Sequence, residues 1–177
     1  MKPTHPTFVS IACYSFSGST LLAMLLNAHP EIATVSEMHG PNPKLIRDIH
    51  TYHCSCGELI HECPFWKQVK IKMADQGFAF DTSDFRVAFG DLGLRDRLRF
   101  GSLRSNLLES IRDDVCQVLP GTRAEMDGMI ARNEAFVRAV CDITGKHVFV
   151  DTSKRTRRFK YMSKYSNLDV RVVFLVR

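Results

Sequence analysis

The chain has 177 residues, of which 45% are hydrophobic and 24% are charged, and this length indicates one domain with a sizeable core. The composition excludes disordered, collagen-like and low-complexity chains. The net charge of +5 favours an anionic partner, whether nucleotide, nucleic acid or membrane surface. No segment reaches the about 18 apolar residues of a membrane span, and none has a signal-peptide pattern. The sequence therefore predicts a cytoplasmic protein without a membrane partner.

The N-terminal part of the chain has the pattern of half an α/β unit. Residues 8–13 are apolar and partly β-branched, which predicts a buried strand. Residues 20–27 are rich in helix formers, and the helix is expected to end before Pro30. A second short strand is expected at 32–37. Residues 78–100 mix Gly, Asp and aromatics without a clear period, which indicates a loop.

The C-terminal part predicts two helices, then a strand, a basic helix and another strand. A first helix is expected to end at Pro120-Gly121 and a second near Gly145, which makes a helical segment at about 101–145. Strands are expected at 148–150 and 170–176, both buried. Strands that alternate with helices indicate a parallel sheet. The two helices carry apolar stripes that are expected to face the core: Leu103, Leu107, Ile111, Val115 and Val118, then Met126, Met129, Ile130, Phe136, Val137 and Val140.

Residues 17–20 (Ser-Gly-Ser-Thr) lie between the first strand and the first helix. Small residues let the backbone curl so that several N–H groups face one point, and a helix N-terminus adds a positive dipole end. The simpler interpretation is a Ser/Thr cap after an ordinary turn, and both remain open on this motif. No Lys follows Gly18 and the first Gly of the nucleoside triphosphatase pattern is absent, so the loop would hold a single phosphate.

Several segments together resemble the sulfotransferases that use 3′-phosphoadenosine 5′-phosphosulfate (PAPS), above all bacterial sulfotransferase-family proteins and tyrosylprotein sulfotransferases. The resemblance runs discontinuously from about residue 8 to the C-terminus and depends on the order and spacing of its motifs. These are Ser17-Gly-Ser-Thr-Leu-Leu22, Ala28-His-Pro-Glu-Ile32 with Glu37, Cys54-Ser-Cys-Gly57 with Cys63-Pro-Phe-Trp66, Val150-Asp-Thr-Ser-Lys154, and Val170-Arg-Val-Val-Phe-Leu-Val-Arg177.

The resemblance implies a P-loop-like three-layer α/β fold with a parallel sheet flanked by helices. The chain would be one incomplete sulfotransferase-like domain (1–177) that is truncated at the C-terminus, because Arg177 directly follows a strand and would only begin the 3′-phosphate site. PAPS would be the co-substrate and a hydroxyl or amine the acceptor, with no metal required. The residues that would cradle the 5′-phosphosulfate are Ser17, Gly18, Ser19, Thr20 and Leu21.

Two further residues take catalytic roles from the resemblance. Glu37 matches the general base of the tyrosylprotein branch, and Lys154 the lysine that supports the leaving oxygen. His39 is a rival base on chemical grounds, because residues two apart in a strand share a face and histidine titrates near neutral pH. The family usually has Arg or Lys where this chain has Phe16, and loss of such a donor could cost about 10²-fold in rate.

Two alternative functions remain open at this stage. One is a nucleotide kinase or triphosphatase, against which the missing loop lysine argues; the other is an inactive nucleotide- or anion-binding remnant. Six basic residues crowd into positions 154–164, and most of them are expected on a solvated helix face. A nucleic-acid surface is disfavoured because few aromatics are interleaved with them.

A His/Cys-rich insertion occupies about residues 50–66. Cys54, Cys56 and Cys63 stand there among three histidines within fourteen positions. A zinc site needs four ligands, and C-x-C with a third cysteine after six more residues is no standard finger pattern. A structural thiol cluster, with a redox-dependent disulfide as one form, is therefore favoured over zinc. Phe65 and Trp66 are expected to anchor the segment in apolar surroundings.

Overall fold

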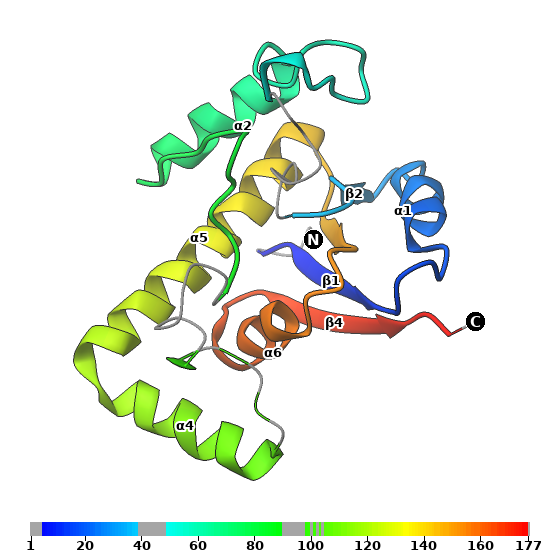
Figure 1. Ribbon diagram of the computed structural model, residues 1–177. Coiled ribbons are helices and arrows are strands. Elements are labelled where there is room, and N and C mark those ends of the chain that lie inside the picture. The colour runs from blue at the N-terminus through cyan, green and yellow to red at the C-terminus, as the bar shows by residue number, and fades with distance from the viewer. Residues whose placement is uncertain are drawn as a thin grey trace.

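The computed structural model describes a mixed α/β chain, shown in Figure 1. The described residues are 5–38, 49–89, 98–99, 101, 103 and 105–176. In chain order the elements are β1 (Thr7–Ala12), α1 (Ser19–Asn27), β2 (Ile32–Thr34), η1 (Ile49–Thr51), α2 (Pro64–Asp75), α4 (Asn106–Val118), α5 (Pro120–Thr144), β3 (Val148–Asp151), α6 (Thr156–Tyr165) and β4 (Asp169–Phe174).

The four strands form one parallel sheet in the order β2-β3-β1-β4. Val9 of β1 lies between Val150 of β3 and Arg171 of β4, and Thr34 of β2 lies beside Val150. Parallel neighbours need crossover connections, and here α1, α5 and α6 lie within them. The expected α/β fold with helices flanking a parallel sheet is confirmed.

The main core lies between the sheet and helices α2, α5 and α6. Phe8 and Phe149 of adjacent strands are completely buried beneath Phe136 of α5. Trp66 of α2 anchors the preceding segment as expected, with its ring centroid 4.8 Å from that of Phe85. Figure 1 shows α1 across the strands from α5. The sheet is therefore covered on both sides, which gives three layers.

Most predicted elements form near their predicted ends. The first strand and helix are confirmed to within a residue. The second of the two predicted C-terminal helices spans Pro120–Thr144, and Gly145 terminates it as the C-cap residue with φ of 68°. The strand expected at 32–37 ends at Thr34, because the chain there turns into a loop. Helix α2 was not predicted. Its buried stripe has only three residues, Trp66, Val69 and Met73, and the lysines between them obscure the helical period.

Helix α4 exposes the apolar stripe that was expected to enter the core. Leu107 is 70% exposed and Val118 81% exposed. The buried side of α4 instead holds Asp113 and Cys116. The expectation was wrong because ion pairs with α6 determine which face of this helix turns inward.

A buried ion network joins α4 to α6. Asp113 is 1% exposed, and its carboxylate lies 2.6 Å from Lys160 Nζ and 2.7 Å from Arg112. Burial alone would raise the pKa of Asp113, but the hydrogen bonds from Lys160 and Arg112 bring it below the ordinary value. Burial and the neighbouring Asp113 charge raise the pKa of Tyr161. The basic segment is thus not simply a solvated helix face.

Strand β4 is exposed although it was expected to be buried. Val173 is 46% exposed and Phe174 72% exposed. The reason is its place at the end of the strand order, where β1 pairs with it on one side. Within the described residues, no helix combines the length and apolarity that crossing a membrane requires.

Candidate functional site

Three loops that follow β1, β2 and β3 meet at the carboxyl edge of the sheet. From β1 the chain runs through α1 to β2, at one end of the strand order. From β3 it runs through α6 to β4, at the opposite end. Neighbouring strands β1 and β3 therefore send their connections in opposite directions. Ligands of open α/β sheets bind at such a switch point, outside the carboxyl ends of the strands. The loops that carry residues 13–18, 35–38 and 152–155 define this edge.

The loop after β1 presents the N-terminus of α1 without a side-chain cap. Gly18 is the N-cap residue with φ of 87°, and its carbonyl accepts the first helical bond, from Leu22 N at 3.0 Å. Glycine has no side-chain oxygen to accept from the amides of the first turn, and the first turn holds no acidic residue. Such amides need acceptors from outside the helix. A phosphate-like anion has oxygens that can accept hydrogen bonds from such amides.

The side chains of residues 17–21 differ in exposure. The Ser17 hydroxyl oxygen is buried and has no hydrogen-bond partner among the described residues, and such orphaned polar atoms are uncommon. Ser19 is buried, whereas Thr20 and Leu21 are exposed on α1. Loop curvature, an uncapped helix N-terminus and an orphaned hydroxyl all fit a phosphate-sized anion at this position.

Left-handed backbone gathers at the same edge. Four non-glycine residues with positive φ are found in the described part of the chain, and three of them follow β1, β2 and β3: Phe16 at 65°, Ser36 at 64° and Lys154 at 57°. Each such residue costs about 1–2 kcal/mol. Strain of this kind concentrates at ligand-binding sites. Phe16 is also 93% exposed, so a large ring stands at the mouth of the loop.

The structure brings Glu37 and Lys154 together. Lys154 Nζ lies 3.3 Å from Glu37 Oε1, and the two side chains are 24% and 42% exposed. The loops that carry them are fastened to each other by Thr152, whose N–H donates to the Ser36 carbonyl at 2.9 Å. The Met38 N–H also donates to Ser153 Oγ at 2.8 Å. A carboxylate and an ammonium group are thus held side by side, and both remain partly exposed to solvent.

A buried ion pair supports Lys154 from below. Asp151 and Arg158 are 1% and 2% exposed, with Arg158 Nη1 3.0 Å from Asp151 Oδ2. The Ser153 hydroxyl donates to Asp151, and Arg158 Nη1 lies 2.9 Å from Ser153 Oγ. Lys154 therefore follows a rigid turn. Sequence reasoning missed this role of Arg158, because nothing in the basic run distinguishes it from its exposed neighbours.

A polar cleft of about 190 Å³ opens beside Lys154 at the N-terminus of α6. The charged side chains that line it are all basic: Lys154, Arg155, Arg157 and Arg158. Arg157 donates a hydrogen bond to the Phe89 carbonyl at 3.3 Å, and this bond joins two of the residues that line the cleft. This lining favours a negatively charged group.

Two predicted site residues, His39 and Arg177, lie outside the described residues. The remaining seven form two groups. Residues 17–21 lie at the end of the loop after β1 and in the first turn of α1, and Glu37 and Lys154 form the ion pair. Glu37 and Lys154 are 117 positions apart in the chain. Their contact follows from the pairing of β2 with β3.

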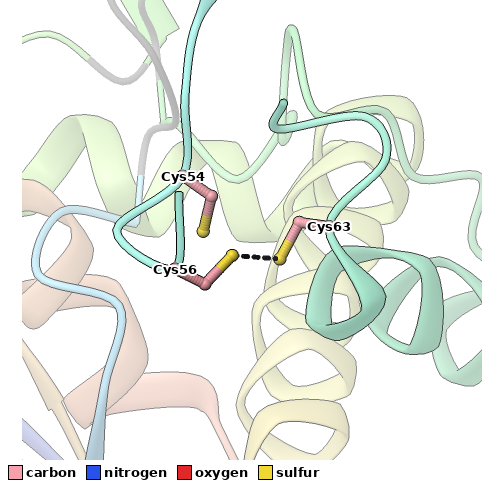
Figure 2. Close-up of side chains that lie close together, drawn as sticks. All are labelled: Cys54, Cys56 and Cys63. Carbon is pink, nitrogen blue, oxygen red and sulfur yellow. Dashed lines mark hydrogen bonds between the residues drawn. The ribbon is translucent and has the colours of Figure 1, made fainter. Parts of the chain in front are cut away.

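The three cysteines of the insertion form a second cluster, away from any strand. Figure 2 shows Cys54, Cys56 and Cys63 pointing toward one another, and their sulfur atoms all lie within 4.8 Å of each other. Burial alone would raise the pKa of Cys54, but hydrogen bonds from the Cys56 amide and the neighbouring thiols bring it below the ordinary value. Burial raises the pKa of Cys63. All three have free thiols.

Comparison of the chain with protein-family models, with curated proteins and with solved structures found no match.

Proposed function

We propose that this protein is a sulfotransferase that transfers a sulfuryl group from PAPS to an acceptor hydroxyl or amine. The observation that carries the proposal is the Glu37–Lys154 contact of 3.3 Å, at the sheet edge where the uncapped N-terminus of α1 also begins. The resemblance to sulfotransferases assigns a role to Glu37, to Lys154 and to the loop before α1, although these lie in three separate segments of the chain.

The loop after β1 holds the donor. The first-turn amides of α1 and the Ser17 hydroxyl donate hydrogen bonds to the 5′-phosphosulfate, and the helix dipole favours its charge. PAPS, when bound, supplies the sulfuryl group, and its adenosine bisphosphate part is a good leaving group. The chain's contribution is positioning and charge stabilisation, as in phosphoryl transfer.

Glu37 acts on the acceptor. Its carboxylate takes the proton of the acceptor hydroxyl as the new oxygen–sulfur bond forms. The bond between sulfur and the bridging phosphate oxygen breaks in the same displacement, and Lys154 neutralises the charge that develops on that oxygen. The ion pair keeps both side chains at the site before substrate binds. The basic cleft beside Lys154 accommodates a further anionic part of a substrate.

Ligand binding provides the first test. At a concentration 100 times its Kd, 3′-phosphoadenosine 5′-phosphate stabilises the fold by about 2.7 kcal/mol, which raises the Tm by about 5–10 °C for a chain of this size. A shift with ATP and none with the adenosine bisphosphate would refute the proposal in favour of a kinase or triphosphatase. Absence of any shift with either nucleotide would also refute it.

Turnover provides the second test, with radiolabelled PAPS and a panel of hydroxyl and amine acceptors. Glu37→Gln and Lys154→Met are each expected to lower kcat by about 10²-fold or more and to leave the unfolding midpoint nearly unchanged. The matched controls are Glu31→Gln and Lys70→Met, which are exposed and lie away from the site. Binding of the nucleotide without turnover on any acceptor would favour the inactive remnant.

A further inference from the structure

We propose that Cys54, Cys56 and Cys63 form a binding site for one Zn²⁺ ion, which ties the 52–63 segment to the N-terminus of α2. This site is separate from the proposed sulfuryl-transfer chemistry. The sequence favoured a metal-free thiol cluster, because the cysteine spacing fits no standard zinc finger. The geometry of the segment supplies the reasons to prefer the metal.

The distances between the sulfur atoms fit a common metal centre. Zn–S bonds of about 2.3 Å in a tetrahedral site place sulfur atoms about 3.8 Å apart. Here Cys56 Sγ lies 3.5 Å from Cys63 Sγ, and all three sulfurs lie within 4.8 Å of one another. Side-chain movements of up to about 1 Å would bring all three sulfurs to the spacing of a tetrahedral site. A disulfide would use two of the thiols and leave the third without a role.

The backbone shapes the segment as a tight knuckle around these thiols. His53 and Leu59 pair as an antiparallel bridge, and the Cys54 N–H donates to the Glu58 carbonyl at 2.8 Å. Gly57 closes the turn with φ of 94°, a conformation that costs glycine little. Cys54 and Cys56 are thereby held on one side of the turn, where they face Cys63 (Figure 2).

Cys63 connects the knuckle to the protein core. It is 1% exposed and is the N-cap residue of α2, three positions before the buried Trp66. Cys56 is exposed and Cys54 half-buried, so an ion and a water molecule can enter from solvent. An ion shared by the three sulfurs would therefore fix a segment that has little regular structure to a helix that packs in the core.

The donor set selects the metal. Thiolates are soft ligands that favour zinc or copper(I) over magnesium and calcium. Among the described residues, no histidine or carboxylate joins the three sulfurs within their mutual 4.8 Å. Zinc accepts three protein ligands with water as the fourth. Water would therefore occupy the fourth coordination position, which the three sulfurs leave open.

Metal analysis of the purified protein tests the site. The chain is expressed with added zinc, purified under a reducing agent without chelator, and its metal content measured. We expect about one zinc per chain, and the intense thiolate-to-cobalt absorption of a four-coordinate site after replacement by Co²⁺. Cys56→Ser is expected to abolish both signals. Because Cys56 is exposed, this variant should fold even if Cys63→Ser does not.

Cys54→Ser and Cys13→Ser form a matched pair, because both cysteines are half-buried and free. The first is expected to lose zinc and the second to keep it. A chelator should lower the Tm of the wild-type protein and of Cys13→Ser, and leave that of Cys56→Ser unchanged. The zinc site would be refuted by a metal-free protein, by copper(I) in place of zinc, or by a Cys56–Cys63 disulfide in protein that was given zinc.

Discussion

Replacement of Arg158 by methionine tests whether the buried ion pair supports the loop that carries Lys154. Methionine keeps most of the apolar stem but removes the guanidinium, which leaves Asp151 buried at 1% exposure without its cation. Removal of one partner from a buried ion pair typically costs about 3–5 kcal/mol. Asp151 still accepts hydrogen bonds from the N–H and hydroxyl of Ser153. We therefore expect the lower end of that range, about 3 kcal/mol.

Urea unfolding followed by circular dichroism measures this loss. A decrease of about 3 kcal/mol corresponds to a Tm lowered by about 6–12 °C in a domain of this length. The control is Arg123→Met, which breaks an exposed pair with Asp127 at 3.7 Å and should cost at most about 0.5 kcal/mol. The double variant Asp151→Asn/Arg158→Met should lose less than the sum of the single variants. A loss below about 1 kcal/mol for Arg158→Met would refute the structural role of the pair.

Four further predictions follow from other parts of the molecule. Because the pKa of Asp113 is lowered in the folded state and that of Lys160 is raised, the free energy of unfolding should fall below about pH 4 and above about pH 10; urea titrations across pH measure this. Phe136→Ala should cost about 3–5 kcal/mol in the same assay, because this ring is completely buried. Gly18→Ala should cost about 1 kcal/mol, since its φ is 87° and no atom obstructs a Cβ. Phe16→Lys should raise the rate of sulfuryl transfer by up to about 10²-fold.

Each of these predictions has its own control. Asp114→Asn, at an exposed carboxylate, should leave the acid limb intact, whereas Asp113→Asn should flatten it. Leu107→Ala, at a 70% exposed side chain, should change stability by less than about 0.5 kcal/mol. Gly128→Ala, inside α5, should stabilise by up to about 1 kcal/mol. Tyr14→Lys, also on the loop, should not reproduce the gain at Phe16. The reverse outcome in any of these pairs would contradict the corresponding argument.

Local patterns predicted most of the secondary structure. The β-branched run of β1, the helix formers of α1 and the stripe of α5 each satisfy a period that depends on neighbouring residues alone. The order of these elements also indicated a parallel sheet, because crossover helices between strands leave few other arrangements. Glycine near the end of α5 marked its terminus for the same local reason. The loop of residues 17–20 could be placed at a helix N-terminus without knowledge of any tertiary contact.

Tertiary contacts decided what local patterns could not. The apolar stripe of α4 remained exposed because Asp113, on its other side, pairs with Lys160 of α6. One arginine of a basic run became buried because Asp151 of β3 lies beneath it. Glu37 meets Lys154 only because β2 and β3 pair side by side. The sequence alone determined most of the elements, since their periods are local. The contacts between elements chose the buried faces and assembled the candidate site, because those energies depend on partners in other elements, as with Glu37 and Lys154, which are 117 positions apart.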